Sequence, residues 1–219
     1  MIPLKDSQST NTVPIWVFAF ITLNIVIFFM QFTSPSNIEF VNKYALIPNL
    51  VDFSKLSTLY PFITSQFLHG GILHLLSNMW FLWIFGDNVE EKFGRLFFPF
   101  VYLLSGIVGA FAQYLFMPNS SIPMIGASGA IAGILGAYFA WFPHHTIKSL
   151  VGIPFFGFGL FDIPASIMLF YWLITQFLSG VGNLIPGQDI GGVAYFAHIG
   201  GFLAGYIIAK LWPRHAYLQ

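Results

Sequence analysis

The chain has 219 residues, of which 57% are hydrophobic, 19% are aromatic and only 7% are charged, and its formal net charge is zero. A soluble domain carries about 25% charged residues, so this composition excludes an ordinary water-soluble protein and favours a multi-span membrane protein. The neutral balance leaves no basic face for nucleic acid, and the absence of cysteine excludes disulfides, thiolate catalysis and cysteine-ligated metals.

Six stretches have the length and polarity of membrane-spanning helices. Each has roughly 20 residues with few or no charges, and backbone groups inside a bilayer must be satisfied within the segment, which requires helices. We therefore expect an all-α integral membrane protein, a single bundle of six transmembrane helices. The predicted spans are residues 14–33, 66–86, 96–117, 125–143, 163–185 and 193–212.

One membrane domain, residues 14–212, accounts for nearly all of the chain. Residues 1–13 form a short polar N-terminal leader with no small-residue cleavage site after it, and residues 213–219 form a short C-terminal tail. The basic residues favour an N-in, C-in orientation. With both ends inside, the inner segments carry Lys5, Lys92, Arg95, Lys148, Lys210 and Arg214, and the outer segments carry only Lys43 and Lys55.

Two outer loops are unusual. Residues 34–65 are long and rich in Leu, Phe, Tyr and Pro, so we expect short segments that lie in the membrane interface rather than a disordered loop. The loop "SGVGNLIPGQDIGG" at 179–192 has five glycines, which predicts a mobile cover over the outer face.

Polar side chains inside the spans are costly, and each needs an explanation. A rise of about 1.5 Å per residue places Ser128, His198 and His74 roughly 5 to 12 Å below the outer boundary, with Asn78 deeper. No Asp or Glu lies well inside a span. Other polar residues in the spans receive no catalytic role here: Asn24, Gln31, Ser77, Ser105, Gln113, Ser166, Thr175 and Gln176.

The spacing of these residues predicts which of them meet. His74 and Asn78 are four residues apart and share a helix face, whereas His69 is turned away and is interpreted as a structural histidine at the helix entrance. Small residues beside Ser128 and His198 predict that the fourth and sixth spans approach closely. These small residues are Gly129, Gly133, Gly136, Gly201 and Gly205.

A serine and a histidine at one depth suggest nucleophilic catalysis. The serine hydroxyl needs a base to take its proton, and histidine suits that task near neutral pH. Because no carboxylate is available to orient the imidazole, the residues predict a Ser128–His198 dyad rather than a triad. His74, Asn78 and the backbone N–H of Ser128 are suitable donors for an oxyanion.

At these residues the chain resembles the rhomboid family of intramembrane serine proteases. The resemblance is carried by "HGGILHLLSN" (69–78), "FGDNVEEKFG" (85–94), "GASG" (126–129) and "AHIGGFLAG" (197–205), and it runs from about 14 to 212 with order and spacing intact. These stretches match the family patterns H-x4-H-x3-N, FG-x-x-VE-x-x-x-G, G-x-S-G and AH-x-x-G-x-x-x-G.

The resemblance implies roles for individual residues. Ser128 would be the nucleophile, His198 the general base, and His74, Asn78 and the Ser128 backbone the oxyanion hole. Four residues would support the site: His69, Gly126, Gly129 and Gly201. The resemblance also implies that residues 180–192 cap the site. Substrates would be single-span membrane proteins cut near the outer end of their helix.

The chain departs from the family pattern at two places. Tyr60 and Pro61 stand where the family often has a Trp-Arg pair, which puts the packing of the first loop in doubt. Ala132 stands where many members have Tyr or Phe, which puts the stacking partner of His198 and the substrate pocket in doubt.

Three alternatives to the protease stay open. A non-catalytic rhomboid-like protein would bind single-span membrane clients without cutting them. A channel or transporter is disfavoured because we see no inverted repeat and no intramembrane carboxylate. A zinc peptidase is disfavoured because H-x4-H lacks the H-E-x-x-H spacing of metal ligands.

We expect no cofactor, no metal and no nucleic-acid partner. The expected partners are the lipid bilayer and single-span transmembrane substrates. The expected location is an integral, multi-pass position in a membrane, specifically a prokaryotic plasma (inner) membrane.

Overall fold

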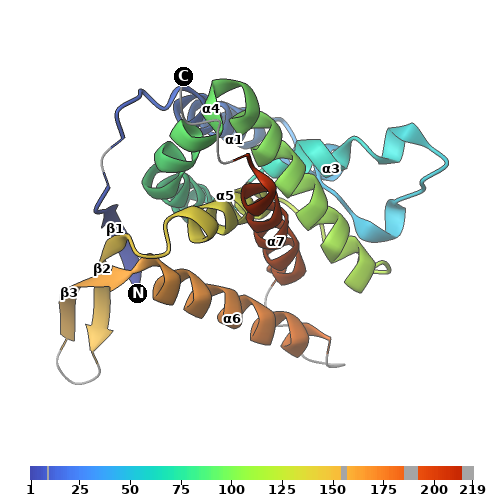
Figure 1. Ribbon diagram of the computed structural model, residues 1–219. Helices are drawn as coiled ribbons and strands as arrows, with labels where there is room; N and C mark the ends of the chain where they lie inside the picture. The colour runs from blue at the N-terminus through green and yellow to red at the C-terminus, as the bar shows by residue number, and fades with distance from the viewer. Residues whose placement is uncertain (9, 154–156, 185–191, 214–219) are drawn as a thin grey trace.

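The computed structural model describes the whole chain except residues 9, 154–156, 185–191 and 214–219 (Figure 1). The C-terminal tail predicted at 213–219 and the centre of the predicted 180–192 cap therefore lie outside the described residues, apart from residue 213 and the margins of the cap. The helices are α1 (Ile15–Thr33), α2 (Asn37–Tyr44), α3 (Pro61–Thr64), α4 (Ile72–Phe116), α5 (Ser128–Trp141), α6 (Ala165–Asn183) and α7 (Tyr195–Leu211). The strands are β1 (Ile2–Asp6), β2 (Thr146–Ile153) and β3 (Gly157–Pro164).

The helical membrane fold predicted from the sequence is confirmed. Among the described residues, α1, α4 and α6 are long and apolar enough to cross a bilayer, and α5 and α7 are shorter apolar helices. The 45-residue α4 is interrupted at Gly94, whose φ of 76° and ψ of 166° are not helical. This is a conformation that glycine adopts without steric cost, and it divides α4 into two arms.

Helix α5 lies at the centre of the bundle (Figure 1). Every residue from Gly129 to Tyr138 is buried. In contrast, α1 and α6 bury only a few positions each and expose apolar side chains, as expected of helices that face lipid. Helix α5 therefore lies between α4 and α7, and α6 lies at the side of the bundle.

The closest approaches between α5 and α7 are made by backbone atoms. A Cβ atom on Gly205 would lie 1.8 Å from the carbonyl oxygen of Gly133, and one on Gly201 would lie 2.0 Å from that of Gly129. A Cβ on Gly136 would likewise lie 2.0 Å from the Phe202 oxygen. The small-residue stripes predicted from the sequence therefore face each other.

Two buried polar side chains, Glu90 and Gln31, hold α1 against α4 and the segment just before it. The carboxylate of Glu90 accepts hydrogen bonds from the backbone N–H groups of Trp16 (3.0 Å) and Val17 (2.9 Å), so it caps the N-terminus of α1. The amide of Gln31 donates to the carbonyl of His69 at 2.8 Å and accepts from its N–H at 3.2 Å. Both α1 ends are thereby fixed to the α4 region.

The long first loop is built from short helical pieces, α2, α3 and the 3₁₀ turns η1 (Pro48–Leu50), η2 (Leu56–Thr58) and η3 (Ser65–Phe67). Tyr60 donates from its hydroxyl to the Lys43 carbonyl at 2.5 Å, and Thr64 donates to the Tyr44 carbonyl at 2.7 Å. Pro61 is the first residue of α3, where its missing N–H costs nothing. Tyr60 thus holds the start of α3 against the end of α2, and Pro61 begins α3.

A three-stranded antiparallel sheet, order β1-β2-β3, lies at one end of the bundle (Figure 1). The prediction of an all-α chain with residues 1–13 as a polar leader is wrong at this point, because the structure contains a sheet. Strands β2 and β3 pair antiparallel, and the predicted leader contributes β1, with Ile2 opposite Leu150 and Asp6 opposite Ile147. The strands have only five to eight residues. β1 precedes the first span, and β2 and β3 lie between α5 and α6, so the hydropathy of the neighbouring spans dominates the sequence pattern.

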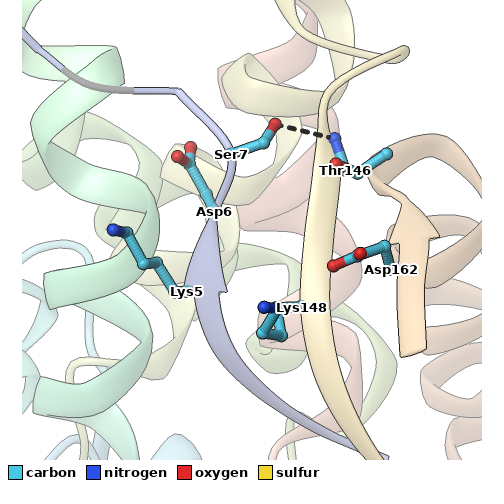
Figure 2. A pocket seen from close by; sticks show the side chains of 6 residues that line it. All are labelled: Lys5, Asp6, Ser7, Thr146, Lys148 and Asp162. Atoms are coloured by element: carbon cyan, nitrogen blue, oxygen red, sulfur yellow. Dashed lines mark hydrogen bonds between the residues drawn. The ribbon is translucent and has the colours of Figure 1, made fainter. Parts of the chain in front are cut away.

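Asp6 connects this sheet to the core. Its carboxylate accepts hydrogen bonds from the Tyr138 hydroxyl on α5 (2.5 Å), the Asn88 amide on α4 (2.8 Å) and the Gln8 N–H (2.7 Å). Figure 2 shows the adjoining pocket of about 300 Å³, where Ser7 accepts from the Thr146 N–H at 3.1 Å. The pocket is lined by Lys5, Asp6, Ser7, Thr146, Lys148 and Asp162.

Substitution of Gly205 tests the α5–α7 contact. Gly205→Ala places a methyl group onto the Gly133 carbonyl, so the two helices must separate, and we expect a loss of at least about 1–3 kcal/mol in the free energy of unfolding in detergent. The matched control is Gly71→Ala, because a Cβ there meets nothing within 4 Å. Equal unfolding midpoints for the two variants would contradict the contact.

The pH dependence of stability tests the Asp6 network. Burial raises the pKa of Asp6 above its ordinary value of 3.8, and the hydrogen bonds from Tyr138 and Gln8 offset only part of this effect. The stability that this group contributes is therefore complete below pH 3.8 and is lost as the pH rises through the raised folded-state pKa. We expect the unfolding free energy of the native chain, measured relative to Asp6→Asn, to be more favourable at about pH 3.5 than at about pH 7. A difference that stays constant with pH would contradict this assignment.

Candidate active site

Ser128 is the first residue of α5 and follows a turn that requires glycine. Gly126 has a φ of +126°, and a Cβ there would lie 2.8 Å from Cε1 and 2.9 Å from Nε2 of His74. Its N–H donates to the Ser65 carbonyl at 2.9 Å. Both the backbone conformation and the close approach of His74 exclude a side chain here, and the turn leaves Ser128 half-buried at the helix mouth.

The structure brings Ser128 and His198 together. His198 lies in the first turn of α7, and its Nε2 is 2.7 Å from Oγ of Ser128. The Gly129–Gly201 contact, one residue after Ser128 and three after His198, brings the two backbones close enough for this hydrogen bond. The contact that holds the helices together is therefore also what sets the distance between the side chains of Ser128 and His198.

Helix α6 surrounds the His198 ring from the other side. Trp172 packs on the imidazole with a centroid distance of 5.8 Å and an interplanar angle of 32°. Position 132 is alanine and offers no aromatic ring to stack on His198; in this chain α6 supplies that ring. Gln176, one turn further along α6, places its Oε1 2.7 Å from Nδ1 of His198.

Sequence reasoning assigned no role to either α6 residue. Trp172 and Gln176 are four residues apart, which places them on one helix face. The available signal in the sequence was an amide four residues after an aromatic ring in a span with few polar groups. This spacing could have indicated a shared contact with another helix. The contact partner could not be known without the packing of α6 against α7.

His74 and Asn78 lie on α4 beside the turn at Gly126. The amide of Asn78 donates to the His74 carbonyl at 3.0 Å, and Asn78 lines the same pocket as Ser128 and His198. The Gly70 N–H points toward Nδ1 of His74 at 3.4 Å. Both residues predicted for the oxyanion hole are thus placed next to the serine, His74 through its contact with Gly126.

His69 lies just before α4 and is fully buried. Its ring packs edge-on against His74, with centroids 5.2 Å apart. Within the described part of the chain, neither of its ring nitrogens has a hydrogen-bond partner. The structure therefore places His69 behind His74, where it supports that ring.

Two cavities adjoin Ser128. The larger has a volume of about 140 Å³ and is mainly apolar. Its lining comes from α4, α5, α6 and α7: Ser77, Asn78, Phe81, Ser128, Ile131, Ala132, Leu135, Trp172 and His198. A smaller cavity of about 30 Å³ lies against Ser65, Gln66, Gly126 and Gly129. Ser128 is thus accessible between helices, and the small side chain of Ala132 leaves room in the larger cavity.

Comparison with known proteins identifies related chains. The model of the Rhomboid domain matches residues 56–214. "RHOMBOID-like protein 6, mitochondrial" of Arabidopsis thaliana is 32% identical over 146 residues, which are 67% of this chain and 41% of that protein. "Rhomboid protein 1, mitochondrial" of Saccharomyces cerevisiae is 29% identical over 197 residues, 87% of this chain and 51% of that protein. "Rhomboid protease GluP" of Bacillus subtilis is 30% identical over 194 residues, 89% of this chain and 35% of that protein.

The chain spans about half or less of the length of these three relatives. Two of the three carry mitochondrial names, so the expected location in a prokaryotic plasma membrane is not supported. The expected multi-pass membrane position is supported by the family match and by the apolar helices. The family model covers more than half of the chain and includes both Ser128 and His198. The chain belongs to the rhomboid family.

Proposed function

We propose that this protein is an intramembrane serine endopeptidase that cleaves transmembrane proteins with a Ser128–His198 dyad. The observation that carries the proposal is the 2.7 Å hydrogen bond between Nε2 of His198 and Oγ of Ser128 beside a cavity between apolar helices. The relative from Bacillus subtilis is named a rhomboid protease, which supports the same activity.

In this mechanism His198 acts first as a base and then as an acid. Its Nε2 takes the proton from Oγ as Oγ attacks the scissile carbonyl, and the imidazolium then gives that proton to the departing amine. Water, activated by the same nitrogen, then hydrolyses the acyl-enzyme. Hydrolysis inside apolar helices therefore needs water at Ser128, which the cavities beside the serine would admit.

Three groups are proposed to stabilise the oxyanion. The Ser128 N–H belongs to the first turn of α5, where backbone donors have no partner within the helix and the helix dipole favours negative charge. The Asn78 amide and the His74 ring lie on the adjoining face of α4. Donors that are already in place stabilise a developing charge well, because they need no reorganisation during the reaction.

The proposed topology has six spans with both termini inside. The two arms of α4 would each cross the membrane, together with α1, α5, α6 and α7. The start of α5 would then lie toward the outer face, so a single-span substrate would be cut near the outer end of its helix. The loop 180–192 would cover the site.

Replacement of the dyad tests the proposal. We expect purified native protein in detergent to react with a fluorophosphonate, and Ser128→Ala and His198→Ala to lose at least about 10³-fold in labelling and in cleavage of a single-span substrate. Ser166→Ala, at the start of α6, is the matched serine control.

Each outcome separates the protease from its alternative. Labelling that persists in Ser128→Ala would show that another residue reacts. Folded native protein that binds a single-span client but neither labels nor cuts would establish the non-catalytic rhomboid-like protein instead.

Replacement of the oxyanion donors gives a further prediction. Asn78→Ala and His74→Ala remove one donor each, and we expect kcat to fall by about 10²–10³-fold, since loss of one such donor acts on the transition state. Leu76→Ala is the control, because Leu76 lies on the same turn of α4 but is 58% exposed. A fall in kcat that Leu76→Ala shares would point to damage to α4 and not to a lost donor.

A further inference from the structure

One polar side chain beside the site has no role in the mechanism above. Gln176 lies on α6, and its Oε1 is 2.7 Å from Nδ1 of His198, on the side of the ring opposite Ser128. His198 is only 9% exposed, so water has little access to compete for this nitrogen. The contact joins the consecutive helices α6 and α7, and with the His198–Ser128 hydrogen bond it forms a chain from Gln176 through His198 to Ser128 on α5.

The neighbours of Gln176 favour the orientation in which its carbonyl faces the histidine. The Thr175 hydroxyl donates to the Trp172 carbonyl at 2.6 Å, so its oxygen is free to accept from the Gln176 amide nitrogen, 3.4 Å away. With its NH₂ group turned to Thr175, the glutamine presents an acceptor to His198. Nδ1 must then carry the proton.

This requirement fixes the state of the catalytic nitrogen. A neutral imidazole has one proton, and the hydrogen bond at one ring nitrogen decides which nitrogen carries it. A proton on Nδ1 leaves Nε2 with a free lone pair toward Oγ of Ser128. The other tautomer would put a hydrogen on Nε2 and could not take the serine proton.

We propose that Gln176 is a positioning residue that holds His198 in the tautomer and ring orientation needed to act on Ser128. This inference rests on the proposed function, and it assigns to a neutral amide the task that a carboxylate performs in a catalytic triad. Trp172, on the same face of α6, packs on the ring and limits its rotation. The base on α7 thus depends on the placement of α6.

Two replacements of similar length test the acceptor. Gln176→Met keeps the length and removes the acceptor, and we expect about a tenfold fall in kcat and in the rate of fluorophosphonate labelling, with KM unchanged, as for loss of one hydrogen bond. Gln176→Glu keeps an oxygen of the same reach and should recover most of the labelling rate. Phe177→Ala is the control, because Phe177 is adjacent on α6 but 52% exposed.

The tautomer itself is measured by ¹⁵N NMR of the histidine rings, with the His198 signals assigned by their loss in His198→Ala. The native chain should show a protonated Nδ1 and an unprotonated Nε2, and Gln176→Met should shift both signals toward a mixture. A purely structural glutamine would change the unfolding midpoint but not this ratio.

Two failures are distinguishable. If the native chain labels and Gln176→Met labels at the same rate with the same ¹⁵N signals, the inference is overturned and the dyad stands. If folded native chain does not label at all, the proposed function fails, and the ¹⁵N signals still decide whether Gln176 sets the tautomer.

Discussion

The backbone contact between α5 and α7 is the constraint on which the rest of the site depends. In a membrane, lipid solvates apolar side chains as well as protein does, so helices associate through close van der Waals packing where small residues let backbones meet. Gly129, Gly133 and Gly136 on one helix face Gly201 and Gly205 on the other, with no room for a Cβ at the closest points. Because Ser128 and His198 stand at the same end of this contact, its geometry sets their 2.7 Å separation.

The few buried polar side chains connect the remaining segments to this pair of helices. Glu90 caps α1, Gln31 holds the backbone at His69, and Asp6 ties β1 to both α4 and α5. Each of the three side chains makes hydrogen bonds with groups from distant parts of the chain. Only 7% of the residues are charged, and apolar packing is not directional. These hydrogen bonds therefore fix how the segments are placed relative to one another.

The helices and the residues that meet at the site were predictable because their signals are local. Each of these signals lies within a single stretch of sequence. They are the spans of membrane length, the glycine spacing beside Ser128 and beside His198, and the i, i+4 pair His74 and Asn78. The sheet was not predictable in the same way, because β1 pairs with β2 across more than a hundred residues. Nor were the roles of Glu90, Trp172 and Gln176, since each depends on which helix packs against which.

The chemistry of Gln176 follows from the cost of charge in this environment. A carboxylate beside His198 would have to be buried among apolar helices, where an ionised group is expensive unless it is fully paired. An amide oxygen orients the imidazole without that cost, because it is neutral in every step. The same neutrality means that it would stabilise an imidazolium less than a carboxylate would. In the proposed mechanism, the charge that forms on His198 would therefore be balanced mainly by the oxyanion that develops on the scissile carbonyl oxygen of the substrate. A site of this kind would gain most from donors already in place around the oxyanion. The turn at Gly126, the start of α5 and the polar face of α4 meet beside Ser128, where the proposed donors lie.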